Sequence, residues 1–427
     1  MKRKIVTRRW YLRIGDNRGL ILPLTLLVMV ILSALALAIL SIGGSEAQIA
    51  SNHLRAVQAA FLAEAGLEHA FNTLQTTPGL MTGATAVLQN IVANPALGGA
   101  GTATGGYTVQ YQAAGPNTVR VVSTGASAIG GSQAIRRAVM STSFSAREAI
   151  LTNGPLGIGG SAGIQDPVFA GQCASVHTNN ALTLSGNASV AGAATAAGSY
   201  TAGGSTTVGP GSGGSRPAEY IPAINPTDFL NTAQASLDAS RIFQMMANGK
   251  VLNGNGTTEL ADLASGGSYC GWHYTAGTPL AEWKFTGNAF CNGTYYLDGH
   301  AKVQSSPGDP GTPWKTTLIA TGDLIVSGSP VIGADAAYTV RDTLFVAGLD
   351  VKLTGTPSNG WNGLIAAHEQ FHVSGNTSVK GFIIGEDASA TSNTVTSNTV
   401  TGNLTLTFSC GLNPPLFGPL QILSWGL

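Results

Sequence analysis

A short stretch near the C-terminus carries the residue types of a zinc protease. His368, Glu369 and His372 fit the pattern H-E-x-x-H, in which two histidines bind zinc and the glutamate acts as a general base. That chemistry requires a helix, because helical spacing brings residues i and i+4 to one face and so to one metal ion. Whether this motif can bind zinc therefore depends on whether the surrounding residues form a helix.

The flanking sequence favours a strand over a helix. It reads GLIAAHEQFHVSGN over residues 363–376, and its end belongs to a repeated motif described below. A strand would separate the two histidines by about 13 Å, whereas zinc–nitrogen bonds are about 2 Å long. No third ligand follows at metzincin spacing. We therefore predict no metal, no cofactor and no catalytic residue here.

Other enzyme classes are not indicated either. Polysaccharide lyases with a β-solenoid fold cluster acidic and basic side chains on one strand face. The charged residues of this chain are scattered, and the Gly-rich stretch 154–163 lacks the lysine and the following helix of a P-loop. The sequence predicts a protein that is not an enzyme. The densest charged stretch contains Asp323, Asp335, Arg341, Asp342, Asp350 and Lys352.

Four cysteines are present: Cys173, Cys270, Cys291 and Cys410. Four cysteines allow three pairings, and an exported chain permits disulfides. Cys270 and Cys291 lie close in sequence, and we predict a bridge between them that adds roughly 3 kcal/mol of stability. The pairing of the other two cysteines is left open. Free buried thiols are the alternative to disulfides. There is no CxxC pair, so a zinc site or redox motif is not expected.

The composition limits the possible functions. Only 10% of the 427 residues are charged, the formal net charge is +0, and glycine occurs 57 times. Low charge argues against a nucleic-acid binder with a basic face. A hydrophobic share of 44% argues against a disordered polyelectrolyte. The length allows two or three domains.

A basic leader and an apolar run open the chain. Seven of the 21 basic residues lie in positions 1–19, opposed only by Asp16. Residues 20–42 carry no charge, and as a helix they would span roughly 34 Å, enough to cross a bilayer. By the positive-inside rule the leader is cytoplasmic and everything after Ile42 is exported. A buried core helix and an ordinary secretory signal are the alternatives.

A second helical segment follows the apolar run. Residues 45–75 contain no proline, and apolar side chains recur there at near-helical spacing. Ser45 is the expected N-cap after a break at Gly43–Gly44, and Pro78–Gly79 is the expected end. A helix over residues 20–77 would place one half in lipid and offer an apolar stripe of the other half to a folded domain.

These N-terminal features resemble those of PilX-type minor pilins, which are components of type IV pilus assembly. The shared pattern is a leader ending in Arg18–Gly19, an apolar helix, and an AEAGLE-like stretch, here within residues 61–68 (FLAEAGLE). The resemblance covers about residues 1–75. It implies cleavage after Gly19 by a prepilin peptidase, with Leu20 as the new N-terminus, and assembly with other pilin subunits through the helix.

One residue departs from the pattern of the major pilins. Those proteins carry glutamate at the fifth mature position, where it neutralises the amino terminus of a neighbouring subunit. Counting from Leu20, this position is Leu24. In this respect the chain resembles tip-located pseudopilins, and the resemblance implies a place at or near a filament tip.

Residues 80–150 suggest a small antiparallel sheet. Strand patterns occur at 105–112, 118–125 and 134–144, separated by turn signals. We expect these strands to form a pilin-like sheet that packs on the exported half of the helix. Three strands of an unrelated α+β unit are the alternative.

From residue 151 to 427 the chain becomes rich in Gly, Ser, Thr, Asn and Val, with short repeats. The segment 184–192 (LSGNASVAG) matches 373–381 (VSGNTSVKG). Each copy is a strand, a Gly-Asn turn and another strand, and we expect positive φ at Gly186 and Gly375. Such repeats are typical of a β-solenoid. A sandwich or jelly roll remains the alternative. Uneven spacing of the copies predicts a looped-out insert at about 193–300.

The sequence as a whole predicts an α+β protein with a long membrane-spanning N-terminal helix, a small pilin-like sheet and a mainly β region, expected to be a β-solenoid. The predicted function is a structural minor pilin of a type IV pilus or related filament. Its large β-rich domain would serve adhesion or assembly priming, through an unknown surface ligand. It would reside in the inner membrane with its C-terminal region exported, and in an extracellular filament after assembly. The alternative is a membrane-anchored adhesin or carbohydrate-active β-solenoid unrelated to pili.

Overall fold

The structure is a computed structural model, and it describes part of the chain. The described residues are 21–76, 89–92, 105–115, 118–127, 133–143, 148–166, 173–392, 394–408, 412 and 414–426. Two units can be distinguished by their internal contacts. The first comprises Met1–Gly66, Ala93–Thr108 and Ser123–Arg136, and the second comprises Leu67–Val92, Val109–Val122 and Arg137–Leu427.

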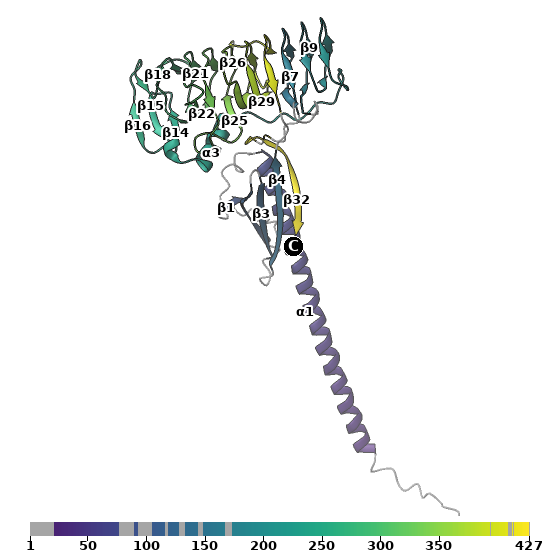
Figure 1. The fold of residues 1–427 in the computed structure, drawn as a ribbon. Helices are drawn as coiled ribbons and strands as arrows, with labels where there is room; N and C mark the ends of the chain where they lie inside the picture. The colour runs from purple at the N-terminus through teal and green to yellow at the C-terminus, as the bar shows by residue number, and fades with distance from the viewer. Residues whose placement is uncertain are drawn as a thin grey trace, which may run out of the picture. The chain divides into compact units, whose positions relative to one another are not determined.

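The first element is one long helix, α1, which spans Ile21–Thr76 and contains 56 residues (Figure 1). The break predicted at Gly43–Gly44 is wrong, because the helix continues through both glycines. Ser45 is not an N-cap: its hydroxyl donates to the Ile42 carbonyl 2.8 Å away, within the helix. Each glycine costs about 1 kcal/mol relative to alanine, which is too little to interrupt a helix whose flanks are good helix formers.

An antiparallel region follows in sequence. A five-stranded sheet has the order β1-β2-β3-β4-β32. The strands β2, β3 and β4 cover the three segments in which strands were expected. The other two strands, β1 and β32, were not expected from the sequence; β32 belongs to the C-terminal segment and pairs antiparallel with β4. The bounds are β1 Gln89–Val92, β2 Gly105–Gly115, β3 Thr118–Ser127, β4 Gln133–Ser143 and β32 Phe417–Gly426.

Most of the remaining chain forms two sheets whose strands are mainly parallel. In the sixteen-stranded sheet lie β5 Glu148–Thr152, β7 Gly163–Gln165, β8 Ser175–Thr178, β10 Ser189–Val190, β11 Ala194–Ala196, β13 Thr207–Val208, β14 Ile242–Met245, β15 Lys250–Asn253, β16 Glu259–Asp262, β20 Gly293–Leu297, β22 Trp314–Ala320, β24 Ile332–Gly333, β25 Thr343–Ala347, β27 Trp361–Ala367, β29 Ser378–Gly385 and β31 Thr405–Thr407.

The eleven-stranded sheet supplies the facing layer. It contains β6 Leu156–Ile158, β9 Leu182–Leu184, β12 Tyr200–Ala202, β17 Ser268–Tyr269, β18 Trp272–Thr275, β19 Glu282–Phe285, β21 His300–Val303, β23 Leu324–Val326, β26 Val351–Leu353, β28 Phe371–Val373 and β30 Asn398–Val400. The large β-rich region expected after the helix is therefore present.

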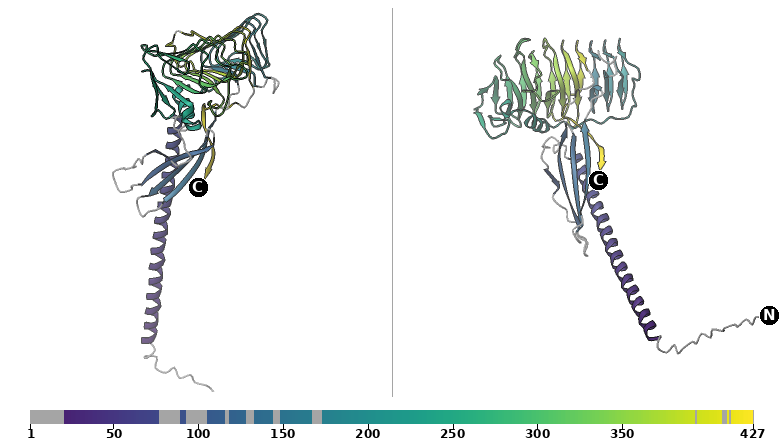
Figure 2. Two further views of the ribbon diagram at one scale, coloured as in Figure 1. Left: turned by 60° about the vertical axis from the view of Figure 1, so that its left-hand side comes forward. Right: turned by 60° about the horizontal axis from the view of Figure 1, so that its bottom comes forward.

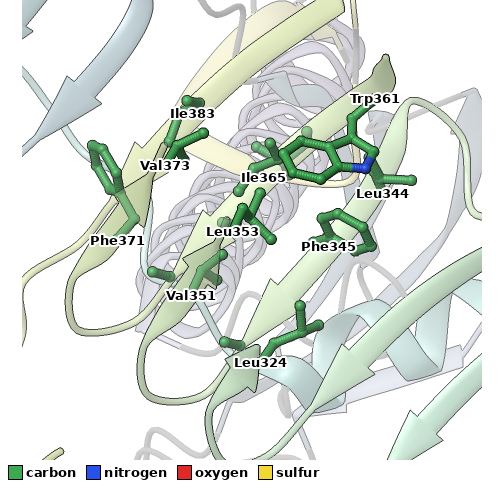
Figure 3. Packing of buried hydrophobic residues seen from close by; sticks show 14 of the residues in the cluster. Leu324, Leu344, Phe345, Val351, Leu353, Trp361, Ile365, Phe371, Val373 and Ile383 are labelled. Atoms are coloured by element: carbon green, nitrogen blue, oxygen red, sulfur yellow. The ribbon is translucent and has the colours of Figure 1, made fainter. Parts of the chain in front are cut away.

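Alternation along the short strands builds the core between the two sheets. In β26, Val351 and Leu353 are fully buried while Lys352 between them is partly exposed. Period-2 alternation of this kind places the apolar side chains of every strand on one face. Figure 3 shows Val351, Leu353, Phe371 and Val373 among the buried side chains that fill this interior.

Glycines with positive φ stand at the corners that the repeats predicted. Gly186 has a φ of 69° and Gly375 a φ of 110°, so the positive φ expected from the Gly-Asn turns is confirmed. A Cβ on Gly186 would meet the backbone of Gly160 at 2.7 Å, because the corners stack directly on one another. Any larger residue would strain both the conformation and the stacking.

The order of the strands in space differs from their order along the chain. In the sixteen-stranded sheet the path runs β13-β10-β7-β31-β29-β27-β25-β22-β20-β14-β15-β16. Strands from residues 148–208 thus adjoin strands from the end of the chain. Figure 2 shows this junction as an abrupt change from yellow to blue-teal along the row of strands.

The excursion out of the two sheets is shorter than the predicted insert at 193–300. Residues 194–208 form β11, β12 and β13, and residues 242–303 form β14 to β21. Between them lies a connection with one helix, α3 Pro226–Ser236, capped by Asn225, and the short 3-10 helix η2 Ala239–Arg241. The predicted insert is therefore largely part of the sheets, because its polar, Gly-rich strands were too short to be recognised.

Candidate functional site

Exposed apolar side chains are concentrated on the first half of α1. Leu24 is 60% exposed, and most large apolar residues from Ile21 to Ile42 are similarly uncovered. This helix is long and apolar enough to span a membrane. Its N-terminal half can therefore serve as a membrane anchor, or as a surface that other apolar helices cover.

The second half of α1 has a narrow stripe of small residues. Ala59, Ala63 and Gly66 are buried on one face of the helix. A Cβ on Gly66 would overlap Ser123 of β3 and Tyr107 of β2, and a Cβ on Gly125 of β3 would overlap the backbone of α1 at Ala59 and Ala63. The AEAGLE-like stretch thus allows helix and strand backbones to approach closely. The small residues of this stretch therefore have a packing role.

The predicted processing site lies outside the described residues. Gly19 and Leu20 are both in this category. Leu24, the fifth residue after the predicted cleavage site, is described and exposed on α1. Nothing in the described structure places a carboxylate at that position of the helix.

The H-E-x-x-H motif occupies a turn and a strand. Residues 368–370 precede β28, which begins at Phe371. His368 Nδ1 lies 2.6 Å from Glu386 Oε2, whereas His372 Nδ1 lies 2.6 Å from Thr399 Oγ1 and its Nε2 lies 3.0 Å from Ser374 Oγ. The two imidazoles therefore have separate partners. Within the residues that the structure describes, no group of three potential ligands is arranged to hold a metal ion.

Glu369, the middle residue of the motif, anchors a neighbouring segment. We call residues 386–397, which connect β29 to β30, the strap; residue 393 of it is not described. Glu369 is fully buried and accepts hydrogen bonds from Ser389 Oγ at 2.6 Å, Thr391 N at 2.9 Å and Ser392 N at 2.8 Å. The carboxylate fixes the strap against the edge of the sheets, which is a structural role.

Two further buried carboxylates continue this arrangement. Asp350 N donates to Asp323 Oδ1 (3.2 Å), and Gln370 N donates to Asp350 Oδ1 (2.9 Å). Each aspartate thus caps the backbone of the next strand of the eleven-stranded sheet. The strap completes both, since Thr394 Oγ1 donates to Asp323 Oδ2 and Val395 N donates to Asp350 Oδ2, each at 2.8 Å.

The pKa values of these acids follow from burial and hydrogen bonding. Burial alone would raise the pKa of Glu369, but the hydrogen bonds from Ser389, Thr391 and Ser392 outweigh it and hold the pKa below its usual value. Asp323 behaves similarly, with His300 and Thr394 among its partners. For Asp350 burial dominates, and its pKa is raised.

The pKa values of His368 and His372 are shifted in opposite directions. The hydrogen bond to Glu386 raises the pKa of His368. Burial, and then the charge of Lys352, lower the pKa of His372. Glu386 also accepts from the backbone N–H of Ile224 at 2.7 Å, so the His368 pair ties the connection before α3 to the strap.

Sequence reasoning missed this group of acids, although a signal was available. Asp323 and Asp350 each directly precede an apolar-x-apolar strand, LIV and VKL, 27 residues apart. A polar residue repeated at the same place before successive strands predicts a stacked ladder of side chains. Taken only as scattered charges, the two aspartates do not reveal this ladder.

Three of the four cysteines lie within the described residues. Cys270 and Cys291 form a disulfide with a Cα–Cα distance of 5.4 Å. It borders an aromatic cluster in which Trp314 Nε1 donates to the Cys291 carbonyl at 2.9 Å. Cys173 is also disulfide-bonded, and Cys410 lies outside the described residues.

An open depression lies beside the C-terminal end of α3. It has a volume of about 410 Å³ and is lined in part by Leu237, Asp335 and Arg341. Two acidic residues, Asp335 and Asp342, line it, and Asp335 is neutralised by Lys315, whose Nζ lies 2.7 Å from Asp335 Oδ2. We assign no ligand to it.

Comparisons with known proteins give a limited result. No family model matches the chain, and no curated protein matches it. A similar solved structure is the crystal structure of the competence-associated pilin ComZ from Thermus thermophilus. The match covers 87% of this chain and 97% of that chain, with 15% sequence identity and a TM-score of 0.32. At this TM-score the likeness is too weak to assign a fold or a family.

Proposed function

We propose that this chain is a minor pilin, a structural subunit of a type IV pilus or related filament. The observation that carries the proposal is the construction of α1. Its first half is an uncharged apolar rod exposed along its length, and its second half uses Ala59, Ala63 and Gly66 to pack against a β-strand. A helix that only anchored a domain would not need the second feature.

The finer parts of the proposal rest on the N-terminal resemblance. The PilX-like pattern supports cleavage after Gly19 by a prepilin peptidase and assembly with other pilin subunits through α1. Leu24 lacks the carboxylate that would pair with a neighbouring amino terminus. We therefore place the subunit at or near the filament tip, with its β-rich region available for adhesion or assembly priming.

We further interpret the two facing parallel sheets as a β-solenoid. The chain alternates between them, and equivalent residues of most strands that follow one another in the same sheet are 18 to 27 residues apart. Stacking supports this interpretation: Ile325 is the register partner of Lys352. Cysteines placed at these two positions should form a disulfide on mild oxidation. Failure to cross-link would count against parallel stacking at this register.

The alternative is a membrane-anchored surface protein that never enters a filament. Processing distinguishes the two, because a pilin loses residues 1–19 and leaves the membrane, whereas an anchored protein keeps them. The test is N-terminal sequencing of protein recovered from sheared filaments. A mature chain beginning at Leu20 supports the pilin. An intact leader in all of the protein, confined to the membrane fraction, refutes it.

Replacing Gly19 provides the matched experiment. A bulky residue there should block the peptidase and leave a membrane-bound form that is 19 residues longer than the mature chain. The control is the same substitution at Gly15, also in the leader, which should mature normally. Normal maturation of the Gly19 variant would remove the central support for processing at this residue.

A further inference from the structure

The strands of the eleven-stranded sheet align one outward side chain each into a continuous row. Pairing sets His273 opposite Lys284, and Lys284 opposite Lys302. Further along, Lys352 lies opposite His372. Neighbouring strands are about 4.8 Å apart. Ile325 of β23 occupies the same register position between Lys302 and Lys352, so Lys284 and Lys352 lie three strand spacings apart. We call five of these residues the basic row: His273, Lys284, Lys302, Lys352 and His372.

The row concentrates positive charge in a chain that has little of it. Only six lysines follow residue 19 in the sequence, and three of them belong to the basic row. Lys302 is neutralised by Glu282, with Nζ and Oε2 2.5 Å apart. Among the described residues, neither Lys284 nor Lys352 takes part in an ion pair. Two uncompensated ammonium groups therefore remain on this face.

Besides Glu282, two further acids lie close to the row, and neither forms an ion pair with its lysines. Asp323 and Asp350 are buried, and each accepts hydrogen bonds from the next strand and from the strap. Two positions beyond the row on the outward side stand the hydroxyl groups of Thr354 and Ser374. The surface therefore offers cations flanked by neutral hydrogen-bonding groups.

Part of the row is held in place before any ligand arrives. The His372 imidazole is hydrogen-bonded on both ring nitrogens, to Thr399 and Ser374. The backbone positions are fixed by parallel pairing on both sides of β26 and β28. A ligand meeting this face would thus order little beyond the lysine side chains, which limits the entropic cost of binding.

We propose that the basic row binds a linear, carboxylated polysaccharide laid across the strands. An extended sugar chain advances by a distance comparable to the strand spacing with each unit, so carboxylates three units apart would meet Lys284 and Lys352, which lie three strands apart. Hydroxyl groups of the sugars would meet Thr354 and Ser374. Charge complementarity and hydrogen bonding to a flat, polar face together define this ligand class.

A single-stranded nucleic acid fits the same face less well. Proteins that bind single strands combine basic grooves with aromatic side chains on which bases stack. The aromatic residues of β18 and β19 instead point inward, and Trp272, Trp283 and Phe285 are fully buried. The row therefore has no stacking platform.

The inference does not depend on the filament, because the row exists equally in an anchored protein. The test uses the full chain purified in detergent micelles, with polygalacturonate oligomers as the probe. The expected result is saturable binding that weakens with added salt. The double variant Lys284→Gln/Lys352→Gln should bind about tenfold more weakly, and Lys284→Arg/Lys352→Arg should retain binding.

The matched control removes two lysines from the other sheet. The variant Lys250→Gln/Lys380→Gln carries the same change of net charge, on β15 and β29, and should bind like the original protein. Thermal unfolding of each variant shows that the fold is retained.

Four results would overturn the proposal. The first is no binding of polygalacturonate by the original protein. The second is equal loss in both glutamine variants, which would indicate nonspecific attraction. The third is tighter binding of single-stranded DNA than of polygalacturonate with the same dependence on Lys284 and Lys352, which would indicate a nucleic-acid surface. Binding of neutral dextran with unchanged affinity would equally refute a role for charge.

Discussion

Gly66 of α1 lies directly against Ser123 of β3, with no room between them for a methyl group. The same contact brings Tyr107 of β2 onto the glycine. A helix normally packs on a sheet through interdigitating side chains, but here the backbone of α1 at Gly66 lies directly against side chains of β2 and β3. The AEAGLE-like stretch is consequently the most sterically demanding part of α1.

Substitution of Gly66 should be costly. Gly66→Val would force Ser123 and Tyr107 apart, and overpacking of this kind typically costs about 1–3 kcal/mol. The matched control is Gly43→Ala, because a Cβ there meets nothing within 4 Å and alanine improves helix propensity by about 1 kcal/mol. Thermal unfolding in detergent checks both. A Gly66→Val protein as stable as the original would show that the contact is not tight.

Protonation of Glu369 should release the strap. The folded-state pKa of Glu369 is lowered, so its contribution to stability is present above the unfolded-state pKa and is lost as pH falls through the folded-state value. Glu369→Gln removes a charged acceptor of several hydrogen bonds and should cost roughly 1–3 kcal/mol at pH 7.

The pH dependence of the free energy of unfolding in the acidic range provides a second test of the role of Glu369. It should be shallower in Glu369→Gln than in the original protein, since this group no longer titrates. Urea unfolding between pH 3 and 7 measures both effects. The folded-state pKa of Asp350 is raised, so its charged form destabilises the fold, in contrast to that of Glu369. Asp350→Asn should therefore cost less stability than Glu369→Gln. Equal cost for both would contradict this assignment.

The His368–Glu386 pair should make the stability of the protein fall as the pH rises. The folded-state pKa of His368 is raised, so its stabilisation is complete below the unfolded-state pKa, about 6.5, and is lost as pH rises through the folded-state value. His368→Gln should abolish that dependence. NMR titration of the imidazole measures the pKa, and a value at or below 6.5 would refute the pairing.

Neither histidine of the H-E-x-x-H motif should affect metal content. His368→Ala and His372→Ala remove hydrogen bonds to Glu386 and to Thr399, so some loss of stability is expected from each. Metal analysis of the purified protein before and after each substitution is the measurement. Stoichiometric zinc that disappears with His368→Ala would revive the metalloprotease hypothesis.

Loss of the Cys270–Cys291 bridge should weaken one end of the parallel sheets. The two cysteines are 21 residues apart, and closing a loop of this length contributes roughly 3 kcal/mol through the unfolded state. Cys270→Ser/Cys291→Ser should therefore lower the unfolding temperature. The matched comparison is the original protein after reduction, which should behave like the double variant if this bridge dominates.

Elements with a strong local signal could be predicted from the sequence. The apolar run before Ile42 and the helical spacing up to Leu74 predict α1, and positive φ at Gly186 and Gly375 follows from the Gly-Asn turns. The break at Gly43–Gly44 was wrong because two glycines weigh little against the continuity of a long helix. Helix propensity, apolar spacing and turn chemistry are properties of neighbouring residues, so features that depend on them can be predicted from a short stretch of sequence.

Features that depend on distant partners could not be predicted in the same way. The strand β32 was missed because its partner β4 lies almost 300 residues earlier. The true role of Glu369 was missed because its hydrogen-bond donors belong to a strap that has no regular pattern of its own. The length of the excursion was overestimated because two- and three-residue strands carry almost no periodic signal.

The junction between the early and late strands determines when the β-rich region can finish folding. At that junction, Asn153 donates to the Glu386 carbonyl across 233 residues of sequence. Until the last strands arrive, β6 and β7 present unpaired edges, which are templates for aggregation. Contacts of such high sequence separation also slow folding. Loss of the final strands would thus leave one edge of β5, β6 and β7 unpaired, so the region should tolerate internal loop changes better than truncation at its end.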